Sequence, residues 1–123
     1  MTHPRRQDLV ARSQLYTNRA LGFACDLMEG RSVPRRIIDQ VAGATTGIGA
    51  NLSETRAQLS RKQMAQCYNI SLRESHESIH WLQALQAVKK GNQDEVQWRL
   101  REAHEFAAIL TVSVRHLRLP PDN

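Results

Sequence analysis

Three residues with clear chemical potential lie close together, because His76, Glu77 and His80 form the sequence H-E-x-x-H. On a helix, two such histidines share a face and can bind zinc, and the glutamate acts as general base. A zinc protease also needs a third ligand, for which the distant candidates are Glu95, Glu102, His104 and Glu105. It also needs a strand that aligns the substrate, and no segment shows the alternation of a strand. We therefore expect no catalytic zinc site, and His76 and His80 are only weak candidates for metal binding.

The same motif is also half of a di-iron carboxylate site. In a helical bundle, such a site needs two E-x-x-H motifs and two further glutamates. Glu77 and His80 supply one motif, but the spacing of Glu102, His104 and Glu105 does not supply the second. We expect no cofactor and no enzymatic activity.

Four further polar residues form two pairs with helical spacing: Asn51 with Glu54, and Glu74 with Glu77. Residues three apart share one face of a helix, and the two pairs fall on antiparallel neighbours. Buried carboxylates need partners, and the candidates are Arg56, Arg73 and His80. We interpret the four residues as a structural polar layer that fixes the helix register or a subunit contact. A ligand or metal site is the alternative.

The positive charge of the chain is carried mainly by arginine. Fourteen of the 17 basic residues are Arg, and the formal net charge is +5. In an up-and-down bundle, one end gathers Arg31, Arg35, Arg36, Lys89 and Lys90. The other end gathers Arg5, Arg6, Arg12, Arg56, Arg61, Lys62, Arg115 and Arg118. An acidic middle separates the two ends and holds Glu74, Glu77, Glu102 and Glu105.

These basic ends are candidate nucleic-acid-binding sites, and at the second end we select Arg61 and Lys62. Guanidinium groups suit bidentate contacts with phosphate. Basic ends repeated in an oligomer would give salt-dependent affinity for RNA or another polyanion. Aromatic residues for base stacking are few, so such binding would read backbone and shape. The alternative is that these cations are solvated helix ends.

Prolines, glycines and capping residues divide the chain into four helical segments. We predict helices over residues 12–29, 34–59, 61–89 and 93–118. Pro34 suits a first helical turn, and Ser60 and Asn92 each begin a sequence of the capping-box type. The sequence therefore predicts one domain over residues 1–123, an all-α, antiparallel up-and-down four-helix bundle. Residues 1–10 and 119–123 are expected to be loosely held ends.

Apolar residues at helical spacing predict the core of this bundle. In the last segment they alternate in steps of four and three, which is typical of a helix packed against partners. These residues are Val96, Leu100, Ala103, Ala107, Leu110, Val114 and Leu117. In the first segment they are Leu15, Ala20, Phe23, Ala24 and Leu27.

The second segment contains Gly43, Gly47 and Gly49, although glycine costs up to about 1 kcal/mol relative to alanine within a helix. Gly43 and Gly47 are four residues apart and share a face. We interpret this pair as a site of close approach between helices, within the monomer or between subunits. A weak, kinked or broken helix is the alternative.

Composition excludes several classes of protein. The 123 residues include 5% aromatics, which is low for a β-sandwich or barrel. No apolar run is long enough to span a membrane, and the N-terminus has no apolar region of a signal peptide. Cys25 and Cys67 lie within helical patterns and are expected to be free thiols. We expect a cytoplasmic protein without a membrane partner.

The region from Gln40 to Leu82 resembles the bacterial four-helix-bundle family named for the 23S rRNA intervening-sequence protein. That family has an S-I-x-A-N-x-x-E block on its second helix, a serine that caps the third, and an E-x-x-E pair before W-L. The matching positions are Gly47, Ile48, Ala50, Asn51, Glu54, Ser60, Glu74, Glu77, Trp81 and Leu82. Gly47 departs from the usual serine of the family, and Thr55 departs from its frequent glycine.

This resemblance implies a small helical bundle, and some members of the family assemble as homopentameric rings. Some are encoded within 23S rRNA genes, and a related branch serves as the accessory protein of diversity-generating retroelements. That branch is similar to a basic ring that binds RNA and a reverse transcriptase. No catalytic activity is established for the family as a whole.

From these observations we expect a non-enzymatic, oligomeric helical bundle that binds RNA or another polyanion non-specifically through its basic helix ends. The expected partners are other copies of the chain, with a pentamer implied by the resemblance alone, and RNA. The first alternative is a purely structural module for protein–protein interaction. A second alternative is a metal-binding protein that uses His76 and His80.

Overall fold

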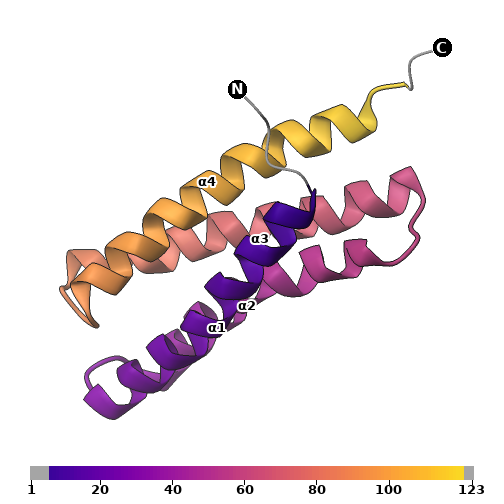
Figure 1. Ribbon diagram of the computed structural model, residues 1–123. Coiled ribbons are helices and arrows are strands. Elements are labelled where there is room, and N and C mark those ends of the chain that lie inside the picture. Colours follow the sequence, from indigo (N-terminus) through magenta and orange to yellow (C-terminus); the bar gives the residue numbers. More distant parts are fainter. Residues whose placement is uncertain (1–5, 121–123) are drawn as a thin grey trace.

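The computed structural model describes residues 6–120, and within this range it contains helices and no strand. The helices are α1 (Arg6–Gly30), α2 (Arg35–Ser53), α3 (Arg61–Ala87) and α4 (Gln93–Arg118) (Figure 1). A short 3₁₀ helix, η1 (Glu54–Arg56), follows α2. Consecutive helices run in opposite directions and pack against each other, which confirms the predicted all-α four-helix bundle.

Helix starts follow the predicted capping residues. The Ser60 hydroxyl accepts a hydrogen bond from the Gln63 backbone N–H at 3.1 Å, and the Gln63 side chain accepts one from the Ser60 N–H at 2.8 Å. At α4, the Asn92 side chain accepts from the Glu95 backbone N–H at 3.1 Å. Such contacts satisfy donors that a helix leaves unpaired at its N-terminus.

Several predicted boundaries were wrong. Helix α1 begins at Arg6 rather than near residue 12, and Leu9 and Val10, assigned to a loose end, are 3% exposed. These two residues extend the apolar surface of α1 onto the core, so the helix gains burial by continuing toward the N-terminus. Helix α2 ends at Ser53 instead of residue 59, because η1 tightens the last turn and Ala57 is extended.

The predicted core stripe of α1 was partly wrong. Leu15 is 53% exposed, whereas its neighbour Tyr16 is fully buried. Phe23 and Leu27 are buried as predicted. On α4 every predicted position is buried except Leu117, which is half-buried. The error on α1 follows from the size of Tyr16, which reaches across to α4.

Two apolar clusters fill the bundle. The first lies toward the loop between α2 and α3, and it contains Leu9, Val10, Tyr16, Ile48, Leu52, Tyr68, Phe106, Leu110 and Val114. The second lies toward the other two loops, and it contains Phe23, Leu27, Ile38, Val41, Leu82, Leu85, Val96 and Leu100. The core therefore runs along the length of the bundle without disulfides, and Cys25 and Cys67 are free as predicted.

Small residues bring α2 close to both neighbouring helices. A Cβ atom on Gly49 would overlap with Oγ1 of Thr17 and lie 3.0 Å from the carbonyl oxygen of Ser13 on α1. A Cβ atom on Gly47 would lie 3.0 Å from the Glu74 side chain of α3. Gly43 has open space around it. The close approach predicted for Gly43 and Gly47 therefore holds for Gly47, with Gly49 as the tighter position, and α2 is continuous through all three.

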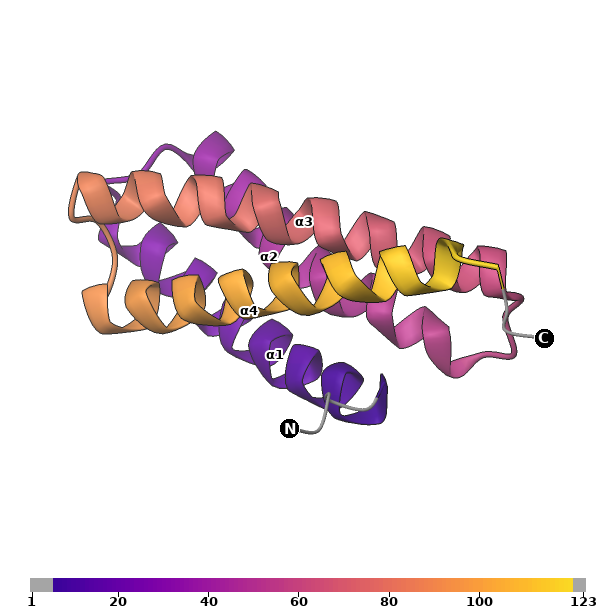
Figure 2. The same cartoon turned by 90° about the horizontal axis from the view of Figure 1, so that it is seen from above.

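Helix α1 crosses the bundle obliquely (Figure 2), and long side chains connect it with α4. Arg99 of α4 is fully buried, and its guanidinium donates to the backbone oxygen of Tyr16 at 3.0 Å. It lies over the Tyr16 ring at 4.0 Å, and the Tyr16 hydroxyl donates to the Arg99 carbonyl oxygen at 3.2 Å. A ring and a guanidinium thus fill the interface where the two backbones are apart.

The loops define two ends of the bundle. The two-loop end holds residues 31–34 and 88–92, and the one-loop end holds residues 57–60 with the C-terminus of α4 (Figure 2). Gly91 has a φ of +83° and packs against Leu27 and Phe23, which joins the second of the two loops to α1. None of the helices in residues 6–120 has the length and apolar character needed to cross a membrane.

Candidate nucleic-acid interface

Five predicted cations lie together at the two-loop end. Arg31 and Lys89 end α1 and α3 in left-handed backbone conformations, with φ of 54° and 55°. The Lys90 N–H donates to the Leu85 carbonyl at 3.0 Å, which closes the last turn of α3. Among described residues, no ion pair involves any of these cations, and all are exposed except the half-buried Lys90. The full set is Arg31, Arg35, Arg36, Lys89 and Lys90.

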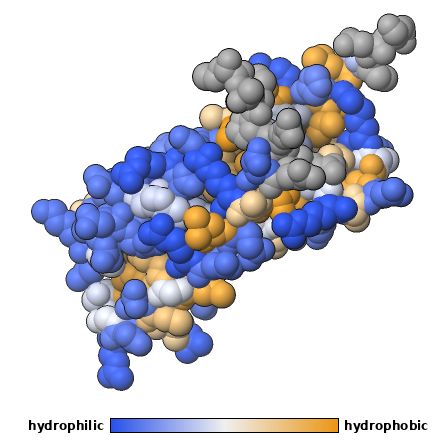
Figure 3. All heavy atoms as spheres, in the orientation of Figure 1, coloured by the Kyte–Doolittle hydropathy of each residue, from blue (hydrophilic) through white to orange (hydrophobic). Residues whose placement is uncertain are grey.

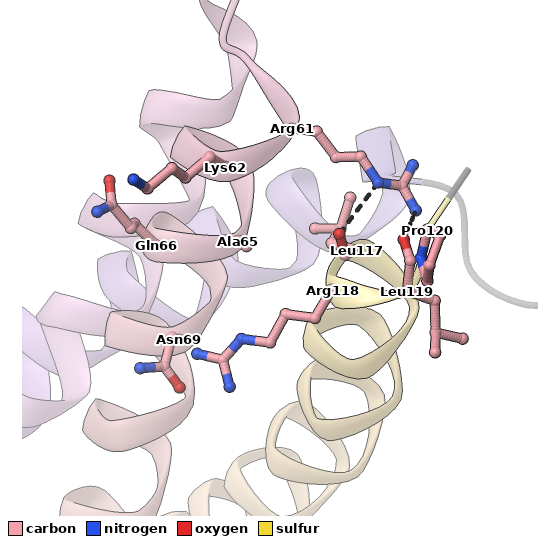
Figure 4. Close-up of a pocket in the computed structure, with 9 residues that line it drawn as sticks. All are labelled: Arg61, Lys62, Ala65, Gln66, Asn69, Leu117, Arg118, Leu119 and Pro120. Carbon is pink, nitrogen blue, oxygen red and sulfur yellow. Dashed lines mark hydrogen bonds between the residues drawn. The ribbon is translucent and has the colours of Figure 1, made fainter.

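At the one-loop end, Arg61 closes the C-terminus of α4. Its guanidinium donates to the carbonyl oxygens of Leu117 at 3.0 Å and His116 at 2.8 Å (Figure 4). The last carbonyls of a helix have no partner within that helix, and a cation there also suits the helix dipole. The guanidinium of Arg61, a predicted nucleic-acid contact, is therefore hydrogen-bonded within the protein.

Arg61 also builds a groove between α3 and α4. The groove has a volume of about 640 Å³, and its walls are Arg61, Lys62, Ala65, Gln66, Asn69, Leu117, Arg118, Leu119 and Pro120. Lys62 and Gln66 extend from α3, while the Arg118 side chain extends from α4 toward Asn69 (Figure 4). Two cations and two amides offer several donors to an anion.

The cations between α1 and α4 are, by contrast, paired with acids. Arg12, predicted among the free cations of the one-loop end, binds Glu102 and Glu105 instead. These hydrogen bonds, Glu102 first, raise the pKa of Arg12 above its usual range. Arg19 binds Glu95 at 2.5 Å and lies 3.6 Å over the ring of Trp98.

Arg99 completes this interface from within the core. It meets Glu95 at 3.3 Å, and burial lowers the pKa of Arg99 while raising that of Tyr16 to about 12. Two of the four residues of the predicted acidic middle, Glu102 and Glu105, are thus bound by the single cation Arg12. Of the remaining predicted cations, Arg56, Arg115 and Arg118 are exposed. The side chain of Arg6 and the whole of Arg5 lie outside the described residues.

Of the predicted polar layer, only Asn51 and Glu74 are half-buried, whereas Glu54 and Glu77 are exposed. Asn51 donates to the Gly47 carbonyl oxygen at 2.8 Å, one turn earlier on the same helix. The Cys67 thiol donates to the Glu54 carboxylate at 3.6 Å, and Glu54 itself is exposed. Glu74 is half-buried against Gly47, and Glu77 is exposed. Within residues 6–120, no hydrogen bond joins these four side chains to one another.

Burial is the main cause of the pKa shifts at the interface of α2 and α3. It raises the pKa of Glu74, an effect that Glu77 increases and Arg73 opposes. Burial and the Glu54 carboxylate also raise the pKa of the Cys67 thiol, which makes it a poorer nucleophile. No ion pair joins Arg56, Arg73 or His80 to these carboxylates in the described chain. Glu74 is therefore a carboxylate that the fold partly desolvates.

His76 and His80 are both exposed on α3. His80 contacts the ring of Trp81 edge-on, with centroids 4.8 Å apart. In the described part of the chain, no third His, Cys, Asp or Glu joins them in a group that could hold a metal ion. Three of the proposed third ligands, Glu95, Glu102 and Glu105, are instead bound by arginines.

The sequence did not point to Arg99, and it did not group Gln66, Asn69 and Arg118 into one site. The available signal for Arg99 was its i, i+4 spacing to Glu95 and the aromatic residue beside it at Trp98. No local signal predicts the groove, because it arises where the start of α3 meets the end of α4.

Comparison with known proteins places the fold in a class of small helical bundles. No protein-family model matches the chain, and no curated protein matches it. Among solved structures, it is similar to a protein of unknown function from the S23 ribosomal protein family of Bacteroides thetaiotaomicron. The TM-score is 0.77 at 22% identity, over 87% of this chain and 98% of that one. The likeness shows the four-helix fold.

Proposed function

We propose that the protein is a non-enzymatic helical bundle that binds RNA or another polyanion non-specifically. We further propose that it belongs to the four-helix-bundle family of the 23S rRNA intervening-sequence protein. The motif between Gly47 and Leu82 supports membership, together with the fold shared with a protein from the S23 ribosomal protein family.

One observation carries the binding proposal. All ion pairs among the described residues lie between α1 and α4 or within α4, and no other described cation forms one. Polar residues cover most of the face that Figure 3 shows, with apolar residues in small separate groups. Unpaired arginine is suited to phosphate, and neutralising phosphates releases counterions. The net charge of +5 favours the approach of any polyanion.

The test is a binding titration of fluorescent single-stranded RNA at about 50 mM and about 200 mM salt. Binding at the lower concentration that weakens by at least about tenfold at the higher one supports the proposal. Absence of binding at about 50 mM salt contradicts it, since electrostatic attraction is strongest there.

A second proposal is that copies of the chain assemble through the outer face of α2. Residues 40–53 carry no charged side chain, and Gly43 and Ala50 on this helix are exposed. Such a surface lets helices of two copies approach without burying charge. The number of copies, for which the family resemblance implies five, is part of this proposal.

Light scattering on the intact protein measures this assembly. Ala50→Arg places a charge on the face and is expected to lower the oligomer mass. Ala84→Arg, on an exposed position of α3, is the matched control and is expected to leave the mass unchanged. A monomeric wild type contradicts assembly, and an oligomer that tolerates Ala50→Arg contradicts this face.

A further inference from the structure

We propose that nucleic acid lies along the outer face that α3 and α4 form together, rather than only at the ends of the bundle. This inference rests on the proposed polyanion binding and gives it a location. We define the α3–α4 face by Lys62, Asn69, Arg73, His76 and His80 on α3, and by Arg101, His104, Arg115 and Arg118 on α4. The histidines of the H-E-x-x-H motif are part of it.

Helical spacing gathers these residues into two neighbouring stripes. On α3 the steps are seven, four, three and four residues, and on α4 they are three, eleven and three, so each set stays on one side of its helix. Every member is exposed except the half-buried Asn69. Lys62 and His80 are about 27 Å apart along the helix axis, at about 1.5 Å per residue.

Contacts made by other residues show which edge of α3 faces α2 and which edge of α4 faces α1. On α3, the edge toward α2 carries Cys67, Ser71 and Glu74, which contact Glu54, the Ile48 carbonyl and Gly47. On α4, the edge toward α1 carries the residues that meet arginines and Tyr16: Glu95, Arg99 and Glu102. The stripes occupy the remaining edges, which adjoin each other.

The groove shows directly that the two edges meet. Lys62 and Asn69 of α3 line it together with Arg118 of α4 (Figure 4). Arg61 holds the end of α4 in place there through carbonyl contacts. Arg61 is therefore a positioning residue, while Lys62 and Arg118 are free to contact a ligand.

One acidic residue near these stripes is bound elsewhere, and two others adjoin the stripes. Glu105, the neighbour of His104, binds Arg12 of α1. Glu77 is exposed and is four residues from Arg73 and three from His80, and Asp94 is exposed and seven residues before Arg101, so these two carboxylates adjoin the stripes. The two stripes together contain five cations, three histidines and one amide, which outnumber the two adjoining carboxylates.

This arrangement fits a phosphodiester backbone. Four arginines and one lysine follow the helices over most of their length, and arginine forms paired hydrogen bonds with phosphate oxygens. Regularly repeated negative charge is the property of nucleic acid that such a line of cations matches.

The test compares two triple variants that remove the same charge. Arg73→Gln, Arg101→Gln and Arg115→Gln change three arginines of the face, whereas Arg31→Gln, Arg35→Gln and Arg36→Gln change the two-loop end. With labelled single-stranded RNA, the face variant is expected to lose at least about tenfold in affinity and about 2 units of salt slope. The end variant is expected to lose less than about threefold. Circular dichroism checks that both variants remain folded.

Each outcome separates the two proposals. Equal losses in both variants, or a larger loss at the two-loop end, overturn the α3–α4 face while polyanion binding stands. A wild type that binds no RNA at about 50 mM salt overturns the proposed function itself. Single-stranded DNA is expected to bind the same face, because the contacts are to phosphate. Displacement of RNA by an equal charge concentration of polyglutamate overturns the preference for nucleic acid.

Discussion

The interface between α1 and α4 is filled by long side chains, whereas α2 meets both neighbours through small ones. Between α1 and α4, Tyr16 and Arg99 cross the space between the backbones, and Arg12 and Arg19 bind glutamates. Around α2, Gly49 leaves no room for a Cβ atom beside α1. On its other side, the Ser71 hydroxyl donates to the Ile48 carbonyl oxygen at 2.9 Å.

The difference shows two ways of closing one bundle. Close packing of backbones needs glycine and serine and leaves little space for charge. A wider interface needs large side chains, and these bring their own polar groups, which require partners inside the protein. The acids and arginines between α1 and α4 neutralise each other there, so the cations available to a ligand lie on the other surfaces.

The largest expected effect comes from Arg99. Arg99→Ala is expected to lower the free energy of unfolding by about 3–5 kcal/mol, because it empties a fully buried position and removes the contact with Tyr16. Arg99→Met keeps most of the volume, and Glu95 retains Arg19, so this variant is expected to lose much less. Urea denaturation measures both.

Arg101→Ala is the exposed control on the same helix and is expected to change stability by less than about 0.5 kcal/mol. If the free energy of unfolding of Arg99→Ala is within about 1 kcal/mol of the wild-type value, long side chains do not hold α1 against α4.

The next effect tests the close contacts of α2. Gly49→Ala is expected to cost about 1–3 kcal/mol, because the new methyl group overlaps with Thr17 and presses on the Ser13 carbonyl oxygen. Gly43→Ala is the matched control on the same helix and has open space. It is expected to stabilise by up to about 1 kcal/mol through helix propensity. Thermal denaturation of the two variants gives the comparison, and equal stabilisation by both would contradict close packing at Gly49.

The smallest effect concerns pH. Burial raises the pKa of Glu74 in the folded state, so its ionised form is less favourable there than in the unfolded chain. Glu74→Gln is therefore expected to stabilise the protein near pH 7. This advantage should shrink as the pH falls through the raised pKa toward the unfolded value of about 4.3, where the wild-type carboxyl is protonated in both states.

Urea denaturation of wild type and variant at several pH values measures this difference. Glu29→Gln, at an exposed position of α1, removes the same charge and is the control. An advantage of Glu74→Gln that grows on acidification would contradict a desolvated Glu74.

Much of the fold follows from local features of the sequence. Ser60 and Asn92 start helices because their side chains bond to free backbone donors, an effect that needs no distant residue. The stripe on α4 was predicted well because its residues alternate in steps of four and three. The start of α1 was missed because Leu9 and Val10 gain their burial only against other helices.

The candidate site was less predictable. Arg12 and Arg61 are ordinary surface cations by local sequence, yet one binds two glutamates and the other closes α4. Both assignments depend on partners more than 50 residues away. The spacing of the H-E-x-x-H motif predicts that His76 and His80 share a face of their helix. It does not predict which residues of other helices lie beside that face.

The sequence by itself determined four helices, their approximate lengths and an excess of arginine, since helical periodicity, capping and charge are properties of local residues. The tertiary structure alone decided which arginines are paired and which remain exposed. It also decided that α2 is close to its neighbours while α1 and α4 are apart. The physical reason is that burial and charge neutralisation depend on residues brought together from distant parts of the chain.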